Sequence, residues 1–105
     1  MSVRAPSAPL ACVSALADPL RHRIVEALAG EELCVCHLVE PLDATQPLVS
    51  HHLKALREAG LVESDRHRYW TDYRLRPERL AWLGAALAEP AAQAPIPGAR
   101  RRPCC

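Results

Sequence analysis

The stretch TQPLVSHHLKALREAG, residues 45–60, carries the clearest helical pattern of the 105-residue chain. Thr45 belongs to the residue types that cap helix N-termini, and Pro47 fits a first turn. Gly60 is a common helix terminator. On a helical wheel, five apolar residues fall on one side: Leu48, Val49, Leu53, Leu56 and Ala59. The pattern predicts an amphipathic helix that packs this side into a core.

The opposite side of this helix carries side chains that donate hydrogen bonds to DNA. They are Gln46, Ser50, Lys54 and Arg57, with His51 at the margin. The early positions Gln46, Ser50 and His51 are placed for base edges, and Lys54 and Arg57 for phosphates. A solvated helix face is the alternative interpretation of the same pattern. His52 falls on the apolar side, where we expect a packed or capping imidazole rather than a DNA contact.

Three shorter helices are expected before residue 45. The first covers residues 10–17. Asp18 is expected to cap the second helix, and Pro19 fits its first position. The third starts at Glu31, where negative charge suits the helix dipole, and runs to about Pro41. The first helix is expected to bury Leu10, Val13, Leu16 and Ala17. The second helix is expected to bury Leu20, Ile24 and Leu28. The residues PLDAT then form a turn.

After residue 60 the apolar period changes from helical to alternating. RYWTDYRL, residues 68–75, alternates and is rich in β-formers, so residues 61–75 predict a hairpin with its turn at residues 65–67. Arg66 and Arg68 at the tip are candidates for contacts with a neighbouring minor groove or backbone. Loop solubility is the alternative role for them. A last helix is expected over residues 77–89.

This order of elements is the plan of a winged helix-turn-helix, a mainly α fold with a small β-hairpin, here expected to be dimeric. Residues 10–89 form the predicted DNA-binding and dimerisation domain. Residues 1–9 are expected to be a flexible arm. Residues 90–105 have too little apolar pattern to pack and are expected to be disordered.

The composition narrows the class of protein further. Half of the residues are hydrophobic and the net charge is +1, so any DNA-binding surface must be local. No apolar run is long enough to span a membrane. Five cysteines, an odd number, argue against a disulfide framework and suggest a cytoplasmic protein with reduced thiols. We expect no enzyme and no organic cofactor, because four glycines and no Gly-rich loop leave no phosphate or oxyanion cradle.

Two of these cysteines stand one residue apart in EELCVCHL, residues 31–38. On a helix, Cys34 and Cys36 would be turned by about 200° and would face nearly opposite sides. Either they are two unrelated core thiols, or the helix opens so that both hold one ion. Thiolates select thiophilic ions. A further thiol for such a site would come from Cys12, Cys104 or Cys105, and His37 is a weaker candidate that could add a nitrogen.

The three further thiols differ in their surroundings. Cys12 lies near the apolar side of its helix, which favours a buried structural role. Cys104 and Cys105 stand at the end of a tail long enough to reach Cys34 of the same or the partner subunit. The arginines at 100–102 beside them favour thiolates. A tail whose cysteines have no role is the alternative.

Four segments resemble, in order and spacing, the ArsR/SmtB metal-sensing repressors. They are ALADPLRHRIVEAL (15–28), ELCVCHL (32–38), TQPLVSHHLKALREAGLV (45–62) and YRL (73–75). The resemblance covers roughly residues 10–87. It implies a homodimer joined through its first and last helices that binds an inverted-repeat operator and leaves it when metal binds. It also implies arsenite or antimonite as inducer, with Cd²⁺, Pb²⁺ or Zn²⁺ as alternatives.

The chain departs from this family at several positions. A third cysteine, frequent in arsenite sensors of this kind, is replaced by Val39, and His37 stands where Asp is common. No histidine occurs between residues 77 and 90, so the zinc site that zinc-sensing relatives carry on the last helix is missing.

These features predict a mechanism. Ion binding is expected to unwind or tilt the helix at Cys34 and so to misalign Gln46 and Ser50 on DNA. A thiol-redox regulator, in which neighbouring thiols oxidise to a disulfide, is the main alternative. A small thiol enzyme or metal carrier is a third.

Overall fold

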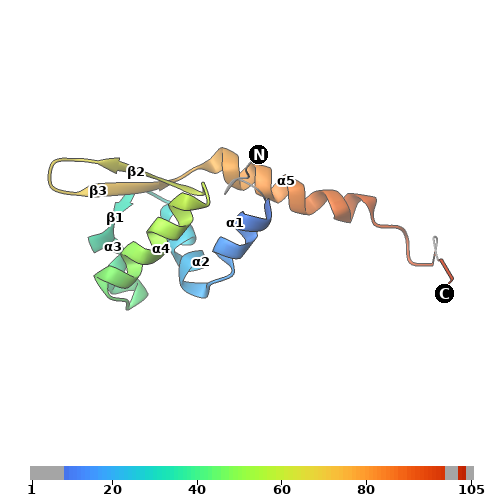
Figure 1. The fold of residues 1–105 in the computed structure, drawn as a ribbon, viewed down its shortest axis with the longest axis horizontal. Helices are drawn as coiled ribbons and strands as arrows, with labels where there is room; N and C mark the ends of the chain where they lie inside the picture. The colour runs from blue at the N-terminus through green and yellow to red at the C-terminus, as the bar shows by residue number, and fades with distance from the viewer. Residues whose placement is uncertain (1–8, 99–101, 104–105) are drawn as a thin grey trace.

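The computed structural model describes residues 9–98 and 102–103, and it has five helices and a three-stranded sheet in that part of the chain (Figure 1). The elements follow one another as α1 (Pro9–Leu16), α2 (Pro19–Leu28), β1 (Leu33–Cys34), α3 (Val35–Leu42), α4 (Gln46–Glu58), β2 (Val62–Arg66), β3 (Thr71–Leu75) and α5 (Pro77–Gln93). This is the expected winged helix-turn-helix with one additional strand, β1.

Helices α1 to α4 form the body of the molecule, and the core lies between them. Its fully buried side chains come from five elements or their ends and include Cys12, Ile24, Leu38, Val49, Leu53, Leu56, Leu61 and Val62. Burying a side chain of this size contributes roughly 1.5–3 kcal/mol, so this cluster fixes how α4 sits on α1, α2 and α3.

The start of α2 matches its sequence signals. The carboxylate of Asp18 accepts from the amides of Leu20 at 2.8 Å and Arg21 at 3.2 Å, and Pro19 occupies the first turn. Burial is the largest single contribution and raises the pKa of Asp18, but the amide hydrogen bonds from Arg21 and Leu20, with the positive charges of His52 and Arg21, together outweigh it and hold this pKa below its usual value. Ile24 and Leu28 are buried, as the apolar spacing predicts.

Helix α4 also begins and ends where expected. Thr45 Oγ1 accepts from the amide of Leu48 at 3.3 Å, and Gly60 ends the helix with a φ of 82°. The predicted core residues Val49, Leu53, Leu56 and Ala59 are buried. The prediction for Leu48 is wrong, since this residue of the first turn is 42 % exposed and does not pack against the core cluster.

In α1 the buried side differs from the expected one. Cys12 and Ala15 point into the core and Leu16 packs against it as expected, while Leu10, Val13 and Ala17 are exposed. The helix is short and apolar on several sides, so its spacing alone did not distinguish the side that packs.

The sheet has the order β1-β3-β2 with antiparallel pairs throughout. In β3, Tyr73 pairs with Leu33 and Ser64, and Asp72 pairs with Cys34 and Asp65. The turn between β2 and β3 lies at residues 67–70 rather than 65–67, closed by the His67 amide donating to the Trp70 carbonyl at 2.7 Å. We call β2, β3 and this turn the wing.

Helix α5 leaves the body and extends away from it on the side opposite to the wing tip (Figure 1). It runs to Gln93 instead of ending at Glu89, with Pro90 inside its last turns. Leu83 is buried, whereas Leu87 is 59 % exposed. Within the described residues no helix is long and apolar enough to cross a membrane.

Candidate functional site

Cys34 lies at the boundary between a strand and a helix. It is the last residue of β1 and the N-cap of α3, with extended backbone angles of φ −94° and ψ 170°. The prediction that the third helix starts at Glu31 is therefore wrong. Pairing of β1 with β3 holds the chain extended through Cys34, and the helix begins only at Val35.

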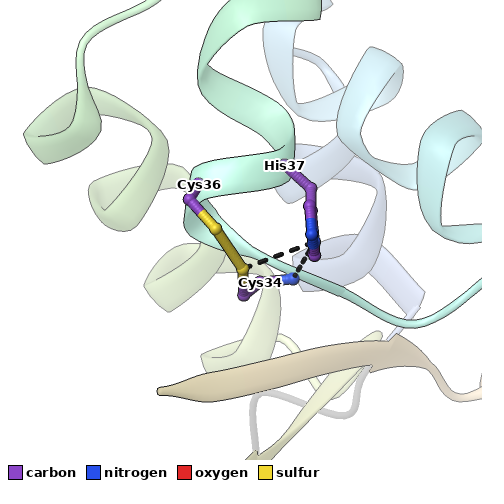
Figure 2. Close-up of side chains that lie close together, drawn as sticks. All are labelled: Cys34, Cys36 and His37. Carbon is purple, nitrogen blue, oxygen red and sulfur yellow. Dashed lines mark hydrogen bonds between the residues drawn. A yellow bond between two sulfur atoms is a disulfide. The ribbon is translucent and has the colours of Figure 1, made fainter. Parts of the chain in front are cut away.

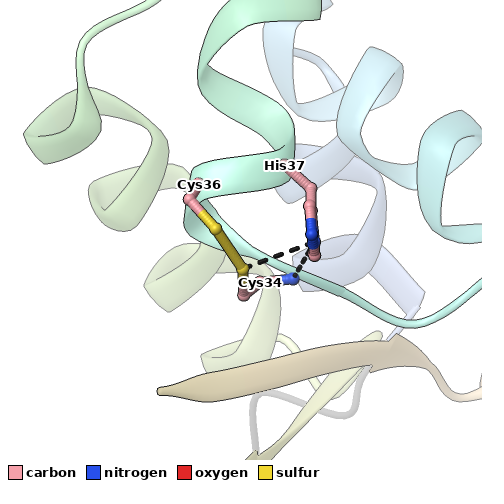
Figure 3. The surroundings of a disulfide bond; sticks show 3 residues. All are labelled: Cys34, Cys36 and His37. Atoms are coloured by element: carbon pink, nitrogen blue, oxygen red, sulfur yellow. Dashed lines mark hydrogen bonds between the residues drawn. A yellow bond between two sulfur atoms is a disulfide. The ribbon is translucent and has the colours of Figure 1, made fainter. Parts of the chain in front are cut away.

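This backbone geometry brings the two sulfur atoms together. The structure joins Cys34 and Cys36 as a disulfide, with their Cα atoms 5.5 Å apart (Figures 2 and 3). The expectation that the thiols face apart until the helix unwinds assumed that both residues are helical. Because Cys34 is extended, both side chains turn to the same side of an intact α3, and no unwinding is needed for them to meet.

His37 is the third member of this cluster. Its Nδ1 accepts from the amide of Cys34 at 3.2 Å and lies 3.3 Å from the Cys34 sulfur (Figure 2). An N-cap amide bonded to the side chain three residues on is one half of a capping box. An amide that donates to Nδ1 requires a lone pair there, so the ring proton of the neutral imidazole lies on Nε2.

The donor atoms of Cys34, Cys36 and His37 all lie within 4.8 Å of one another. Cys34 is buried, and Cys36 and His37 are exposed, so the cluster opens to solvent on one side. Two sulfurs and one imidazole nitrogen form a donor set for soft or borderline ions and a poor one for Mg²⁺ or Ca²⁺. In the disulfide form neither sulfur is a thiolate, so the pair cannot bind an ion in that form.

The other cysteines divide into two groups. Cys12 has no exposed surface, and its thiol donates to the carbonyl of Ala59 at 3.4 Å. Burial raises the pKa of this thiol, and the positive charge of Arg79 opposes that shift. The structure therefore does not bring Cys12 to the Cys34 cluster. Cys104 and Cys105 lie outside the described residues.

The predicted DNA-contacting side of α4 is exposed along its length. Gln46, Ser50, His51, Lys54 and Arg57 are all on the surface. Arg57 additionally donates to the hydroxyl of Ser64 on β2 at 3.3 Å, which ties the end of α4 to the base of the wing.

His52 is packed, as expected, and its partner was not foreseen. Only 7 % of the residue is exposed, and its Nδ1 accepts from Arg21 Nε of α2 at 2.9 Å. Burial lowers the pKa of His52 below its usual value; Arg21 and His51 act in the same direction, and Asp18 opposes them. His52 thus links α2 and α4 through its hydrogen bond with Arg21, as the expectation of a packed imidazole predicts.

The wing tip carries the expected basic side chains. Arg66 ends β2 and Arg68 lies in the turn, both exposed. Arg68 lies over the ring of Tyr69, 5.6 Å from its centroid. His67 stacks on Trp70 with ring centroids 4.7 Å apart, and its Nε2 lies 3.1 Å from the carboxylate of Asp72.

Two features of the site could not be predicted from the sequence. A two-residue strand such as β1 has no detectable alternation, so its pairing with β3 was invisible. The role of His37 had a weak signal in its spacing of three residues from Cys34, which is the spacing of a capping box.

Comparison with known proteins identifies the relatives of this fold. A family model described as bacterial regulatory protein, arsR family, matches residues 18–64. The arsenic resistance transcriptional regulator ArsR1 of Pseudomonas putida is 47% identical over 73 residues, which are 69% of this chain and 57% of the regulator. The arsenical resistance operon repressor of Escherichia coli is 42% identical over 82 residues, 77% of this chain and 70% of the repressor.

A solved structure supports the same assignment. The homodimeric winged helix-turn-helix DNA-binding domain from Mycobacterium bovis, determined by solution NMR, matches with a TM-score of 0.63 and 29% identity over 81% of this chain and 82% of that domain. The relatives are transcriptional regulators rather than enzymes, which removes the thiol-enzyme hypothesis. The chain therefore belongs to the arsR family of bacterial regulatory proteins.

Proposed function

We propose that this chain is a cytoplasmic, homodimeric repressor that binds an inverted-repeat operator and is released when a thiophilic ion binds Cys34 and Cys36. The observation that carries the proposal is the meeting of the two sulfurs at the start of α3, the first helix of the helix-turn-helix. Arsenite or antimonite is the inducer we place first, because two curated relatives are arsenic-resistance regulators. Cd²⁺, Pb²⁺ and Zn²⁺ are the alternatives.

Operator contact is assigned to the exposed side of α4 and to the wing tip. In a helix-turn-helix the second helix enters the major groove with its N-terminal residues on base edges. Gln46, Ser50 and His51 take that role here, and Lys54 and Arg57 contact phosphates. Arg66 and Arg68 reach the neighbouring minor groove or backbone.

The ligand set starts from two sulfurs per subunit and needs a third donor. His37 supplies one in the same subunit, because its Nδ1 already lies 3.3 Å from the Cys34 sulfur. A nitrogen donor suits Zn²⁺ or Cd²⁺ better than trivalent arsenic, which prefers a third sulfur. Cys104 or Cys105 of the tail remains the candidate for that sulfur.

Release follows because the ion competes with the Cys34 amide for His37 Nδ1 at the start of α3. An ion that takes the Cys34 sulfur and His37 Nδ1 removes the hydrogen bond that the Cys34 amide now makes to that nitrogen. The first turn of α3 must then adjust, and α3 packs directly on α4. Coupling of this kind is typically ~1–3 kcal/mol, a change of roughly 5- to 150-fold in operator affinity.

The test is operator release by arsenite, followed by fluorescence anisotropy under reducing conditions. The double variant Cys34→Ser, Cys36→Ser should bind the operator as the wild type does and should no longer be released. Cys12→Ala is the matched control and should be released normally. Release of the double variant at the same arsenite concentration would place the inducer site elsewhere.

Two further variants separate the third-donor candidates. His37→Gln keeps an acceptor for the Cys34 amide, since Gln serves at this position of a capping box, but it is a poor ligand for soft ions. It should weaken the response to Cd²⁺ by about tenfold or more, in line with the loss of one ligand-supporting group. Cys104→Ser, Cys105→Ser should instead weaken the response to arsenite, if the tail provides the third sulfur.

The disulfide itself favours a second candidate function, regulation by oxidation. Hydrogen peroxide would take two electrons and two protons from the Cys34 and Cys36 thiols, form the sulfur–sulfur bond and leave as two water molecules. Titration of operator affinity with peroxide, in parallel with arsenite, separates the two. Release by peroxide alone would make the protein a redox regulator.

A further inference from the structure

The Cys34 backbone is bonded to the wing as well as being part of the helix-turn-helix. As the last residue of β1, Cys34 pairs with Asp72 in β3, and β3 is the central strand of the sheet. Figure 2 shows the end of the β3 ribbon directly beside Cys34. A displacement of the Cys34 backbone therefore acts on two elements: on α3, which it caps, and on β3, with which it pairs.

From Asp72 a continuous set of contacts leads to the wing tip. The Asp72 carboxylate lies 3.1 Å from His67 Nε2, across the turn. The His67 ring stacks on Trp70, and the His67 amide donates to the Trp70 carbonyl. Arg68 lies inside the same turn. The path from the thiol cluster to this arginine thus runs through one strand pair and one side-chain pair.

His67 lies beside two carboxylates of the wing that repel each other. Asp72 pairs with Asp65 on β2, so two carboxylates stand directly opposite each other on the same face of the sheet, an arrangement that destabilises strand pairing. The imidazole of His67 bonds to one of them and offsets that repulsion. Without it, the outer half of the wing would lose a contact that fixes the direction of its tip.

The attachment of β1 is weak enough to respond to an ion. It contains two residues and forms two paired positions, Leu33 with Tyr73 and Cys34 with Asp72. The base of the wing is held independently, by Arg57 on Ser64 and by the Glu63 carboxylate on Arg74 and Arg76. Loss of the β1 pairing would therefore redirect the outer wing without unfolding it.

We propose that ion binding at Cys34 also repositions the wing, in addition to its effect on α4. Asp72 and His67 are the positioning residues that connect Cys34 to Arg66 and Arg68. The inference rests on the proposed function, in that the ion binds at Cys34 and Cys36. It differs in assigning part of the release to the wing instead of to α4 alone. An ion that repositions Cys34 weakens the β1–β3 pair, and the arginines lose their place on DNA.

The first experiment measures the ratio of operator affinities without and with a saturating ion, for arsenite and Cd²⁺ separately. His67→Ala and Asp72→Ala should reduce this ratio by about fivefold or more, at the lower end of typical allosteric coupling. His67→Gln, whose amide can still donate to Asp72, should restore it. The control is His22→Ala, which removes an exposed histidine–carboxylate pair within α2 that has no connection to the site.

The outcomes separate the two proposals. A purely structural role of His67 and Asp72 would lower affinity equally with and without ion and leave the ratio unchanged, and this result would overturn the inference. If the wild type binds the ion without any release, or if Cys34→Ser is still released, the proposed function itself fails. Metal-thiolate absorbance reports ion binding in every variant, independently of DNA.

The second experiment follows the wing in the free protein. The chain has two tryptophans, so in the background Trp82→Phe the fluorescence reports Trp70 alone. Saturation with Cd²⁺ should change this emission in the absence of DNA, and Cys34→Ser should remove the change. Unchanged Trp70 emission, and unchanged hydrogen exchange of the β3 amides in the wild type, while metal-thiolate absorbance shows full binding, would contradict the proposal.

Discussion

Cys12 and Cys36 show two opposite environments for a thiol within one small domain. Cys12 sits in the middle of α1, has no exposed surface and donates to the carbonyl of Ala59, the C-cap of α4. Cys36 sits in the first turn of α3, is exposed and lies against the sulfur of Cys34. One thiol stabilises the packing of α1 on α4, and the other is available for chemistry.

The difference follows from position in the helix rather than from residue type. A thiol inside a helix that packs on another helix is surrounded by apolar side chains, which disfavour the thiolate. A thiol at a helix N-terminus meets unpaired amides and the positive end of the dipole, which favour negative charge. This division of roles between Cys12 and Cys36 can be tested in three ways.

The largest expected difference is in alkylation after reduction. Cys36 should react with iodoacetamide at the rate of an exposed thiol, whereas Cys12 should react only through opening of the core. With a typical domain stability, this protection amounts to a factor of about 10³ or more. Peptide mapping by mass spectrometry over time measures both rates in one sample. Comparable rates would mean that the α1–α4 contact opens readily and that the contrast does not exist.

A smaller effect is expected when Cys12 is replaced. Cys12→Ala leaves a small cavity and removes the bond to the Ala59 carbonyl, which should lower the free energy of unfolding by about 1–2 kcal/mol. Urea denaturation measures the change, and anisotropy measures operator release by arsenite, which should stay normal. Loss of release in a folded Cys12→Ala protein would make Cys12 a ligand after all.

The smallest effect is a loss of stability at alkaline pH. Burial raises the pKa of Cys12 in the folded state above its ordinary value of 9.0, so the folded protein holds this proton more tightly than the unfolded chain. The resulting stabilisation is complete below pH 9 and is lost as the pH rises through the folded-state pKa. Thermal denaturation between pH 8 and pH 10.5 should show a steeper decline for the wild type than for Cys12→Ala. Parallel curves would show that the thiol is not protected.

The sequence predicted most of the helical scaffold because its signals are local. Asp18 with Pro19, and Thr45 with Pro47, fix helix starts through bonds to amides two or three residues away. The buried side of α4 follows from spacing, with the exception of Leu48. Spacing and residue type mark Cys34 and Cys36 as candidate ligands, but the relative orientation of their side chains was predicted wrongly.

Three of the predictions that failed depend on a pairing or packing partner outside the element itself. The start of α3 is set by β3, about forty residues later, which pairs with Leu33 and Cys34 and keeps them extended. The position of the wing turn is set by the register of β2 on β3, and the buried side of α1 by the position of α4. None of these contacts leaves a periodic pattern in the neighbouring residues.

From the sequence we could predict the winged helix-turn-helix order, the caps of α2 and α4, the polar side of α4 and the presence of two neighbouring thiols. Residue type and short-range spacing are sufficient for these features. Long-range contacts, in contrast, make the thiols face each other, bring His37 beside them and pair Cys34 with β3 of the wing. Strand pairing imposes an extended conformation on Cys34 that local preference does not encode, and this one backbone state turns the side chains to the same side.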